Sequence, residues 1–283
     1  VSEYCDDDVY ATEATWFATQ AEFKAREILV ELVKIIHSID ANVNMTTNTL
    51  SAKIIFGNNK TPQLNYVAAQ EQLRKEFPEY EFKQITDDGG KTHWINWYRN
   101  TDLGFGGYVY ASPGMYGNID VEDVASMHPT TIEVLKLLGE EGTKLFSVIK
   151  NLRIDIKHKE FDKARHLFEG KLAPYLEDED MAKGLAGALK IVINSVYGLT
   201  SAKFDNPFTD RPNNANNIVA LRGALMMRTL QDEVEARGFK VVHIKTDSIK
   251  IADATPEIIE FVREFGKKYG YNFETEDTFD RIC

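Results

Sequence analysis

The first third of the chain opens with apolar residues at helical spacing and then loses any regular pattern. The helical set is Phe17, Ala21, Ala25, Ile28, Leu32 and Ile36. Residues three or four apart share one side of a helix, so this spacing predicts an α-helix over 14–38. Residues 42–116 are mixed, with a strand-like run at 53–56 and turn-forming residues at 57–59 and 87–90.

From residue 117 onward, strand patterns and helix patterns alternate. Runs of apolar or alternating residues predict strands at 118–124, 239–244 and 248–251, and a further strand beginning at 271–273. A period near 3.6 predicts the helices 130–150, 157–174, 179–196, 215–237 and 256–270. Pro256 suits the first position of its helix, and Gly198 and Gly238 suit helix ends.

The order of these elements predicts the fold class. Lys245-Thr246-Asp247 separates two apolar strands, which indicates a hairpin with Asp247 at its tip. Strand, helix, hairpin, helix and strand together are typical of an α+β fold, in which helices back an antiparallel sheet. The helical segment 133–190 is inserted between the first strand and the rest.

Composition sets bounds on the class of protein. The chain has 283 residues, 43% of them hydrophobic, which suffices for one large domain or two modest ones. No run of about 18 apolar residues occurs and the start has no signal region, so no membrane span and no targeting segment is predicted. Cys5 and Cys283 lack metal-ligand spacing, and a reducing, cytoplasmic setting fits best.

Charge is distributed unevenly along the chain. The net charge of -11 argues mildly against nucleic acid as a partner. Six cations nevertheless fall within residues 150–165 among few acids: Lys150, Arg153, Lys157, Lys159, Lys163 and Arg165. A protein that handles polyphosphate needs a local basic track as well as acids that hold metals, so the distribution matters more than the sum.

Two acids lie at the ends of predicted strands. Asp123 ends the strand 118–124 and precedes a helix, and Asp247 projects from the hairpin tip. The turn after Asp123 could aim the backbone N–H groups of 126–128 at an anion. Taken singly, each acid is better explained as a solvated turn or cap residue than as a functional one.

A third pattern changes the interpretation. Lys190, Asn194 and Tyr197 share one helix face within Lys-x-x-x-Asn-Ser-x-Tyr-Gly. This segment resembles motif B of family B DNA polymerases, residues 123–132 resemble its motif A, and Lys245-Thr246-Asp247-Ser248 resembles its motif C. The order of the three motifs and the spacings between them match the family, and the motif sequences are similar in style to those of bacteriophage replicative polymerases.

The resemblance implies a role for each matching residue. Asp123 and Asp247 would be catalytic, and Asp123, Val124 and Asp247 would hold two Mg²⁺ ions, with Mn²⁺ as an alternative. The nucleotide-binding residues implied are Ser126, Met127, His128, Arg153, Lys157, Lys190, Asn194 and Tyr197. Hard divalent cations prefer carboxylate oxygens, which suits this assignment. Arg153 and Lys157 are also explained as a solvated helix face.

Two departures from the family pattern stand out. His128 replaces the usual Tyr that excludes a ribose 2′-OH, and we hypothesise that it keeps this gate function; a packing histidine is the alternative. Lys245 replaces the first acid of Asp-Thr-Asp-Ser, so its role is open between pairing with an acid and contacting primer phosphate. Thr246 and Ser248 are uncertain site residues beside it.

The resemblance also implies a division of the chain. Tyr4 and Asp8 resemble the third exonuclease motif, which places the end of a 3′–5′ exonuclease domain and a connecting helix at 1–40. Residues 41–116 would be a connector and the start of the palm, 117–132 palm with motif A, 133–190 fingers, and 191–283 palm with motifs B and C. The thumb and the other exonuclease acids are expected to lie outside this sequence, so exonuclease activity is not expected from it alone.

The predicted function is template-directed transfer of deoxynucleotides to a primer 3′-OH in DNA replication. Primer-template DNA and deoxynucleoside triphosphates would be the partners, in the cytoplasm, or the host cytoplasm for a phage protein. Two alternatives stay open. The chain is a catalytically incomplete fragment that grips primer-template, or it is a structural subunit of a split polymerase whose partner chains supply the exonuclease acids and the thumb.

Overall fold

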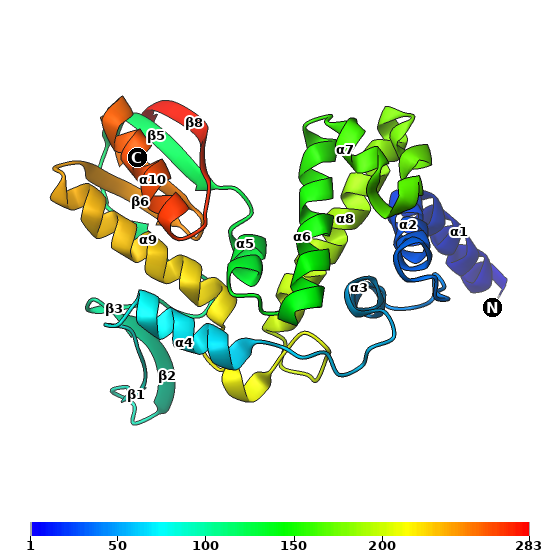
Figure 1. Ribbon diagram of the computed structural model, residues 1–283, viewed down its shortest axis with the longest axis horizontal. Coiled ribbons are helices and arrows are strands. Elements are labelled where there is room, and N and C mark those ends of the chain that lie inside the picture. The colour runs from blue at the N-terminus through cyan, green and yellow to red at the C-terminus, as the bar shows by residue number, and fades with distance from the viewer. Residues whose placement is uncertain (1, 283) are drawn as a thin grey trace. The chain divides into compact units, whose positions relative to one another are not determined.

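The chain folds into two compact units (Figure 1). The computed structural model describes residues 2–282, with side chains from residue 6 onward. The first unit contains residues 1–63, 140–199 and 206–208, and the second contains 64–139, 200–205 and 209–283. Within residues 2–282, no helix combines the length and the apolar character that crossing a membrane requires.

The first unit is helical. Its α-helices are α1 (Ser2–Ala18), α2 (Gln20–His37), α3 (Thr47–Phe56), α6 (Gly139–Lys157), α7 (Phe161–Arg165) and α8 (Glu179–Thr200), with 3₁₀ turns η1 (Leu167–Gly170) and η2 (Ala173–Leu176). Apolar residues at helical spacing on α2, α6 and α8 are fully buried and form its core, among them Leu32, Val33, Phe146, Leu152 and Leu189.

Several predicted elements of this unit are corrected by the structure. The run 53–56 lies in helix α3, where Leu50, Ile54 and Ile55 are buried at helical spacing and the Thr46 side chain caps the N-terminus. The helix predicted at 14–38 is interrupted at Thr19 between α1 and α2. Residues 157–174 do not form one helix but break into the short pieces α7, η1 and the start of η2, because Lys159, Phe168 and Glu169 take positive φ angles. Helix α8 continues through Gly198 to Thr200.

The second unit is built on a five-stranded antiparallel sheet. Its strands are β4 (Val109–Ala111), β5 (Tyr116–Val124), β6 (Lys240–Lys245), β7 (Ser248–Ala252) and β8 (Phe273–Ile282), in the order β4-β6-β7-β5-β8. Helices α9 (Ile218–Ala236) and α10 (Pro256–Lys268) back the sheet (Figure 1). The predicted α+β class and the hairpin around Asp247 are therefore confirmed.

The strand and helix bounds here follow the sequence closely. Helix α9 ends just before Gly238, which takes the positive φ of 86° expected at a helix end. Its start is capped by Asn214, whose Oδ1 accepts a hydrogen bond from the Ile218 N–H at 2.8 Å. The helix predicted at 130–150 is wrong as one element, because Lys136 breaks it with a φ of 49° between α5 (Met127–Val134) and α6.

A second, smaller sheet precedes the first sheet in the chain. It comprises β1 (Glu81–Thr86), β2 (Thr92–Tyr98) and β3 (Thr101–Asp102), and α4 (Tyr66–Glu76) and the turn η3 (Arg211–Asn213) belong to the same unit. Asp87 closes the β1–β2 hairpin, since its side chain accepts bonds from the N–H groups of Gly89 and Lys91. The turn predicted at 87–90 is thus present, whereas the two strands around it were not predicted.

Candidate functional site: two carboxylates and a basic cavity

The end of β5 and the β6–β7 hairpin bring Asp123 and Asp247 together. Asp123 pairs with Ser248 across the strands, and the Val124 N–H donates a hydrogen bond of 2.9 Å to the Asp247 carbonyl oxygen. The preceding residue, Glu122, is buried, and its carboxylate pairs with Arg263 of α10 at 3.2 Å. Side chains alternate along a strand, so Asp123 points to the face of the sheet opposite α10.

The surroundings of Asp123 favour its protonated form. Burial raises the pKa of Asp123 to about 7, and the negative charges of Asp247, Glu276 and Glu274 add to the effect. Glu274 lies directly across from Asp123 in the β5–β8 pairing. Carboxylates gathered in this way repel one another, so a cation placed among them would be bound favourably.

The oxygen donors fit a hard divalent cation. In the described part of the chain, residues 2–282, no three His, Cys, Asp or Glu side chains are grouped as a complete metal cage. Mg²⁺ does not need such a cage, because it is usually held by one or two carboxylates together with substrate phosphates and water. Asp123 and Asp247, with a main-chain oxygen of Val124, would be the metal ligands that the protein supplies.

A glycine-rich segment contacts the hairpin tip that carries Asp247. Thr246 takes a φ of 58°, and its N–H donates a 2.9 Å bond to the Tyr108 carbonyl oxygen. Gly107 has a φ of 120°, and a Cβ on it would lie 2.8 Å from Thr246 Cγ2. The segment 104–108 is therefore packed against the tip. Lys245 is exposed and pairs with Val109 of β4.

Helix α5 follows Asp123 and begins beside it. Ser126 precedes the helix with a φ of 57°, and the Met127 side chain is buried against Gly223 of α9. Thr131 anchors the helix through a 2.6 Å hydrogen bond to the Tyr271 hydroxyl. Burial lowers the pKa of His128, while the charge of Asp247 acts in the opposite direction. The imidazole thus lies within the field of Asp247 and is neutral at pH 7.

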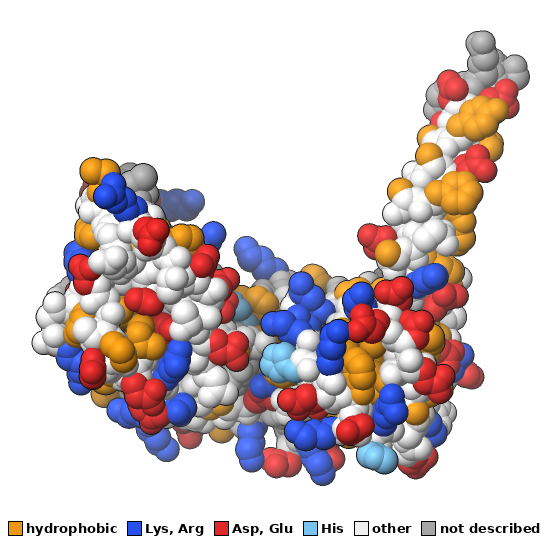
Figure 2. Space-filling view, turned by 90° about the horizontal axis from the view of Figure 1, so that it is seen from above, with side chains coloured by type: hydrophobic (Ala, Val, Ile, Leu, Met, Phe, Trp, Pro, Cys, Tyr) orange, Lys and Arg blue, Asp and Glu red, His pale blue; other side chains and the backbone are white. Residues whose placement is uncertain are grey.

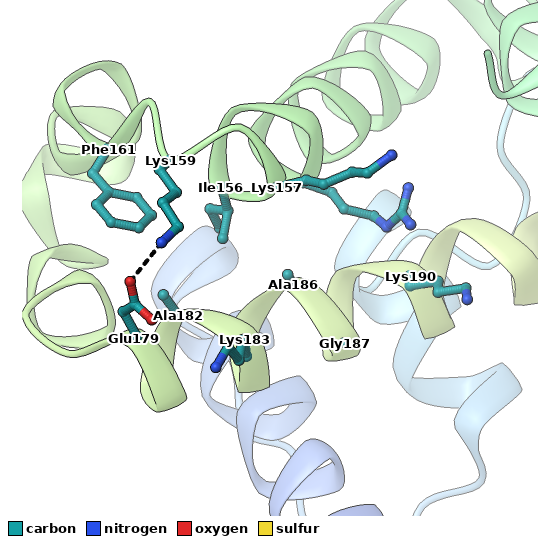
Figure 3. A pocket seen from close by; sticks show the side chains of 11 residues that line it. Ile156, Lys157, Lys159, Phe161, Glu179, Ala182, Lys183, Ala186, Gly187 and Lys190 are labelled. Atoms are coloured by element: carbon teal, nitrogen blue, oxygen red, sulfur yellow. Dashed lines mark hydrogen bonds and ion pairs between the residues drawn. The ribbon is translucent and has the colours of Figure 1, made fainter. Parts of the chain in front are cut away.

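In the first unit, α6 and α8 line a basic cavity of about 330 Å³. Arg153 and Lys157 come from α6 and Lys190 from α8, and Figure 3 shows Lys157 and Lys190 on the two helices. Lys159 also lines the cavity and binds Glu179 at 2.6 Å, and Lys183 lines it from α8, one turn before Gly187. Glu179 is the single acid among the described lining residues, so the cavity suits an anion.

The exposed face of α8 continues from this cavity toward its C-terminal end. Lys183, Gly187, Lys190 and Asn194 are exposed at intervals of three or four residues, and Tyr197 is half-buried on the same face. Burial raises the pKa of Tyr197, so its hydroxyl stays neutral at pH 7. The helix thus presents the three polar residues of the predicted motif on one side.

Comparison with known proteins adds a line of evidence that does not depend on the geometry of the site. No protein-family model matches the chain. DNA polymerase II of Escherichia coli strain K12 is 28% identical over 159 residues, which are 50% of this chain and 19% of that protein. The predicted resemblance to family B DNA polymerases is confirmed. The structure of the family B DNA polymerase from Pyrobaculum calidifontis aligns with 90% of this chain and 33% of its own, at 12% identity and a TM-score of 0.45.

The chain therefore spans much less than two thirds of either relative. The narrower similarity to bacteriophage polymerases, the palm and fingers boundaries and the roles of single residues stay predictions. Asp123, Asp247 and residues 126–128 lie together in the second unit, and the basic cavity lies in the first. Asp8 is exposed on α1, and the side chain of Tyr4 is outside the described residues.

Two residues near Asp123 were missed by sequence reasoning. Glu274 and Glu276 lie on β8, of which only 271–273 was predicted as strand. A register shift between β5 and β8 places Asp277 and Thr275 opposite consecutive residues of β5, so Glu276 has no partner in the pairing. The available sequence signal was Glu-Thr-Glu after an apolar strand start. It points to the surroundings of Asp123 only once the pairing of β8 with β5 is known.

Proposed function

We propose that the chain carries the core of a template-directed DNA polymerase of family B. The reaction is attack of a primer 3′-hydroxyl on the α-phosphate of a deoxynucleoside triphosphate, with pyrophosphate as the leaving group. The observation that carries the proposal is the meeting of Asp123, at the end of the inner strand β5, with Asp247, at the tip of the β6–β7 hairpin, where burial and like charge raise the pKa of Asp123 to about 7.

The two carboxylates would hold divalent cations, with Mg²⁺ as the natural choice and Mn²⁺ as the alternative. When bound, such cations supply positive charge that makes the primer hydroxyl more acidic and offsets charge on the leaving group. The protein's own task is to keep both carboxylates ionised and aimed at one point. The hydrogen bond from Val124 to Asp247 and the packing of Gly107 on Thr246 support that task.

Arg153, Lys157 and Lys190 would bind the triphosphate of the incoming nucleotide. Their cavity offers three cations with few competing acids, and phosphate oxygens accept charge-assisted hydrogen bonds from such groups. The backbone N–H groups of Ser126 and Met127 would bind phosphate as well. Asn194 and Tyr197, on the exposed face of α8, would lie under the nascent base pair.

His128 would exclude a ribose 2′-hydroxyl from the site. The ring is flat, is partly buried and lies close enough to Asp247 to feel its charge. A neutral imidazole adds no charge that would weaken cation binding by Asp247. Lys245, exposed beside the hairpin tip, would contact primer phosphate, since it is not among the described ion pairs with carboxylates.

Primer extension with Mg²⁺ tests the proposal. The unaltered chain should add the nucleotide that the template base specifies, and Asp123→Asn or Asp247→Asn should reduce the rate by 1000-fold or more, on the order of the loss of a catalytic metal ligand. Primer-template affinity should be unchanged in both variants. Asp120→Asn on the same strand is the matched control and should extend normally. Extension by Asp123→Asn at the unaltered rate would refute the assignment.

A further inference from the structure

Residues 269–272, the turn between α10 and β8, run along helix α5 from its end to its start. At the C-terminal end of α5, a Cβ on Gly270 would lie 2.8 Å from Val134 Cγ2. At the other end, the Ala125 N–H donates a 2.9 Å hydrogen bond to the Asn272 carbonyl oxygen. The turn therefore contacts α5 at its C-terminal end and the chain just before its first residue.

Between these two contacts, the Tyr271 hydroxyl reaches the middle of α5. Its oxygen lies 2.6 Å from Thr131 Oγ1, and both side chains are fully buried. Thr131 Oγ1 also lies 3.1 Å from the Met127 carbonyl oxygen, which can only accept. Thr131 therefore donates its proton to Met127 and accepts a hydrogen bond from Tyr271, whose hydroxyl stays protonated because burial raises the pKa of Tyr271. The hydrogen bonds thus run from Tyr271 to the first residue of α5.

The turn 269–272 is itself held by a buried arginine. Charged side chains of this chain are mostly at its surface, where Figure 2 shows acidic and basic groups interspersed, whereas Arg222 is only 1% exposed. Its Nε and Nη2 bind the Glu76 carboxylate at 2.8 and 3.2 Å, and Nη2 donates a 2.9 Å bond to the Tyr269 carbonyl oxygen. The guanidinium also lies 5.1 Å from the centroid of the Tyr271 ring. Because a buried charge is stable only with its partners in place, Arg222 favours one arrangement of the turn.

The start of α5 contains residues that would meet the incoming nucleotide. Backbone N–H groups at a helix start bind an anion well only when they are held at one point. Ser126, which precedes the helix, takes a φ of 57°, a conformation that a serine keeps only where neighbouring contacts maintain it. The hydrogen bonds to Asn272 and Tyr271 lie on either side of Ser126 and supply such contacts.

We propose that Tyr271 is a positioning residue for nucleotide binding. The turn 269–272 fixes the start of α5, so that its backbone N–H groups and the His128 ring meet the nucleotide in one geometry. Tyr271 is fully buried, so it acts through Thr131 and does not itself touch the nucleotide. The inference deepens the proposed function and rests on it for the identity of the ligand, whereas the positioning of α5 is a property of the fold.

Primer extension at varied deoxynucleotide concentration tests the inference. Tyr271→Phe removes only the hydroxyl and should raise the KM for the nucleotide by about 3- to 10-fold with kcat nearly unchanged, since one buried hydrogen bond has about that effect. A merely structural role would give the opposite split. Partial unfolding lowers the concentration of active chain, and hence the apparent kcat, while KM stays the same.

Tyr98→Phe is the matched control. Tyr98 is 3% exposed, and its hydroxyl lies 3.0 Å from Thr229 Oγ1, which donates in turn to the Leu225 carbonyl oxygen at 2.8 Å. The substitution thus removes the same kind of hydrogen bond from α9 instead of α5, and KM should stay as in the unaltered chain. Thr131→Ser keeps the hydroxyl and should also leave KM unchanged, whereas Thr131→Val should repeat the rise if Tyr271→Phe does not fold.

Hydrogen exchange followed by mass spectrometry gives a readout that needs no catalytic activity. Tyr271→Phe should speed exchange of the amides in 125–135 by about 3- to 10-fold and leave those of α9 unchanged, because exchange reports the free energy of local opening. Tyr98→Phe should leave 125–135 unchanged.

Three results would overturn the inference: equal acceleration of exchange throughout the chain in Tyr271→Phe, an unchanged KM in a Tyr271→Phe protein that extends primers, or an equal rise of KM in Tyr98→Phe. If the unaltered chain extends no primer while Tyr271→Phe still speeds exchange at 125–135, the polymerase proposal is refuted and the positioning of α5 is retained.

Discussion

Asp123 is held in surroundings that oppose its own ionisation. Its pKa moves from 3.8 to about 7 through burial and through the charges of Asp247, Glu276 and Glu274. Because the folded-state pKa lies above the unfolded value, the native state holds this proton more tightly between about pH 4 and pH 7. Ionised Asp123 thus lowers the free energy of unfolding at neutral pH, a cost that a functional site tolerates.

Asp123→Asn should therefore raise thermal stability while it abolishes catalysis. Without added metal at pH 7, we expect a melting temperature about 2–6 °C higher than that of the unaltered chain, after allowing for solvent screening of a half-buried group. The difference should shrink as the pH falls from 7 and vanish below the unfolded-state pKa of 3.8, where both states of the unaltered chain are protonated. Thermal unfolding by circular dichroism across this pH range measures it. A variant less stable than the unaltered chain at pH 7 would contradict the argument.

His128 offers a test of substrate selection at the scale of one ring. Removing the imidazole in His128→Ala opens space where the sugar would lie, so ribonucleotide incorporation relative to deoxynucleotide incorporation should rise by about tenfold or more. The comparison of kcat/KM for the two nucleotides measures this ratio. His128→Tyr should keep discrimination, because it retains a flat ring. An unchanged ratio in His128→Ala would leave His128 as a packing residue.

At the scale of elements, a glycine loop and a hairpin tip fit closely together. Gly107→Ala would place a Cβ 2.8 Å from Thr246 Cγ2 at a residue whose φ of 120° already disfavours a side chain. We expect a loss of about 2–3 kcal/mol of unfolding free energy and a displaced Asp247, because left-handed backbone strain and steric overlap add.

Gly106→Ala is the control for that change. No atom lies within 4 Å of a Cβ at Gly106, and its backbone is outside the positive-φ region. It should be close to neutral in urea unfolding and in primer extension. Equal effects of the two substitutions would show that the loop does not position the hairpin.

The elements differ in how far the sequence alone could define them. Helices α9 and α10 and the β6–β7 hairpin were predicted nearly to the residue, because glycine, proline and apolar periodicity agree there. Residues 53–56 misled the analysis, since Ile54, Ile55 and Phe56 favour strands locally while tertiary burial of Leu50 and Ile54 selects helix α3. The prediction of one helix over 157–174 was wrong because the positive-φ residues that interrupt it, Lys159, Phe168 and Glu169, are not glycines and so give no signal in the sequence.

The site was predictable in the same uneven way. Asp123 and Asp247 were identified through motifs, and the pairing of β5 with β7 shows why a strand end and a hairpin tip meet. Glu274 and Glu276 needed the register of β8, which no local pattern encodes.

At the scale of the whole molecule, the two units have different proposed roles. The second unit supplies carboxylates, and the first supplies the basic cavity of Arg153, Lys157 and Lys190. Nucleotide binding should therefore respond to changes in the first unit, with primer-template binding left intact. This division is independent of which relative the chain resembles.

Lys190→Gln tests the division. Loss of one charge-assisted hydrogen bond to phosphate should raise the KM for the deoxynucleoside triphosphate by about 10- to 100-fold. Lys144→Gln is the control, because Lys144 is an exposed residue of α6 nine positions before Arg153 and thus on the opposite side of that helix. Steady-state extension at varied nucleotide concentration measures both. A KM that responds equally to the two substitutions would contradict a specific role for Lys190.

The central claim is that Asp123 and Asp247 act as one cation site. The rise in melting temperature on adding Mg²⁺ tests it most directly, since a ligand at ten times its dissociation constant stabilises a protein by roughly 1.4 kcal/mol. Asp123→Asn and Asp247→Asn should each remove most of the rise, the double variant should lose no more than either, and Asp120→Asn should keep it. Losses that add in the double variant, or a full rise in Asp247→Asn, would show that the two carboxylates do not share an ion.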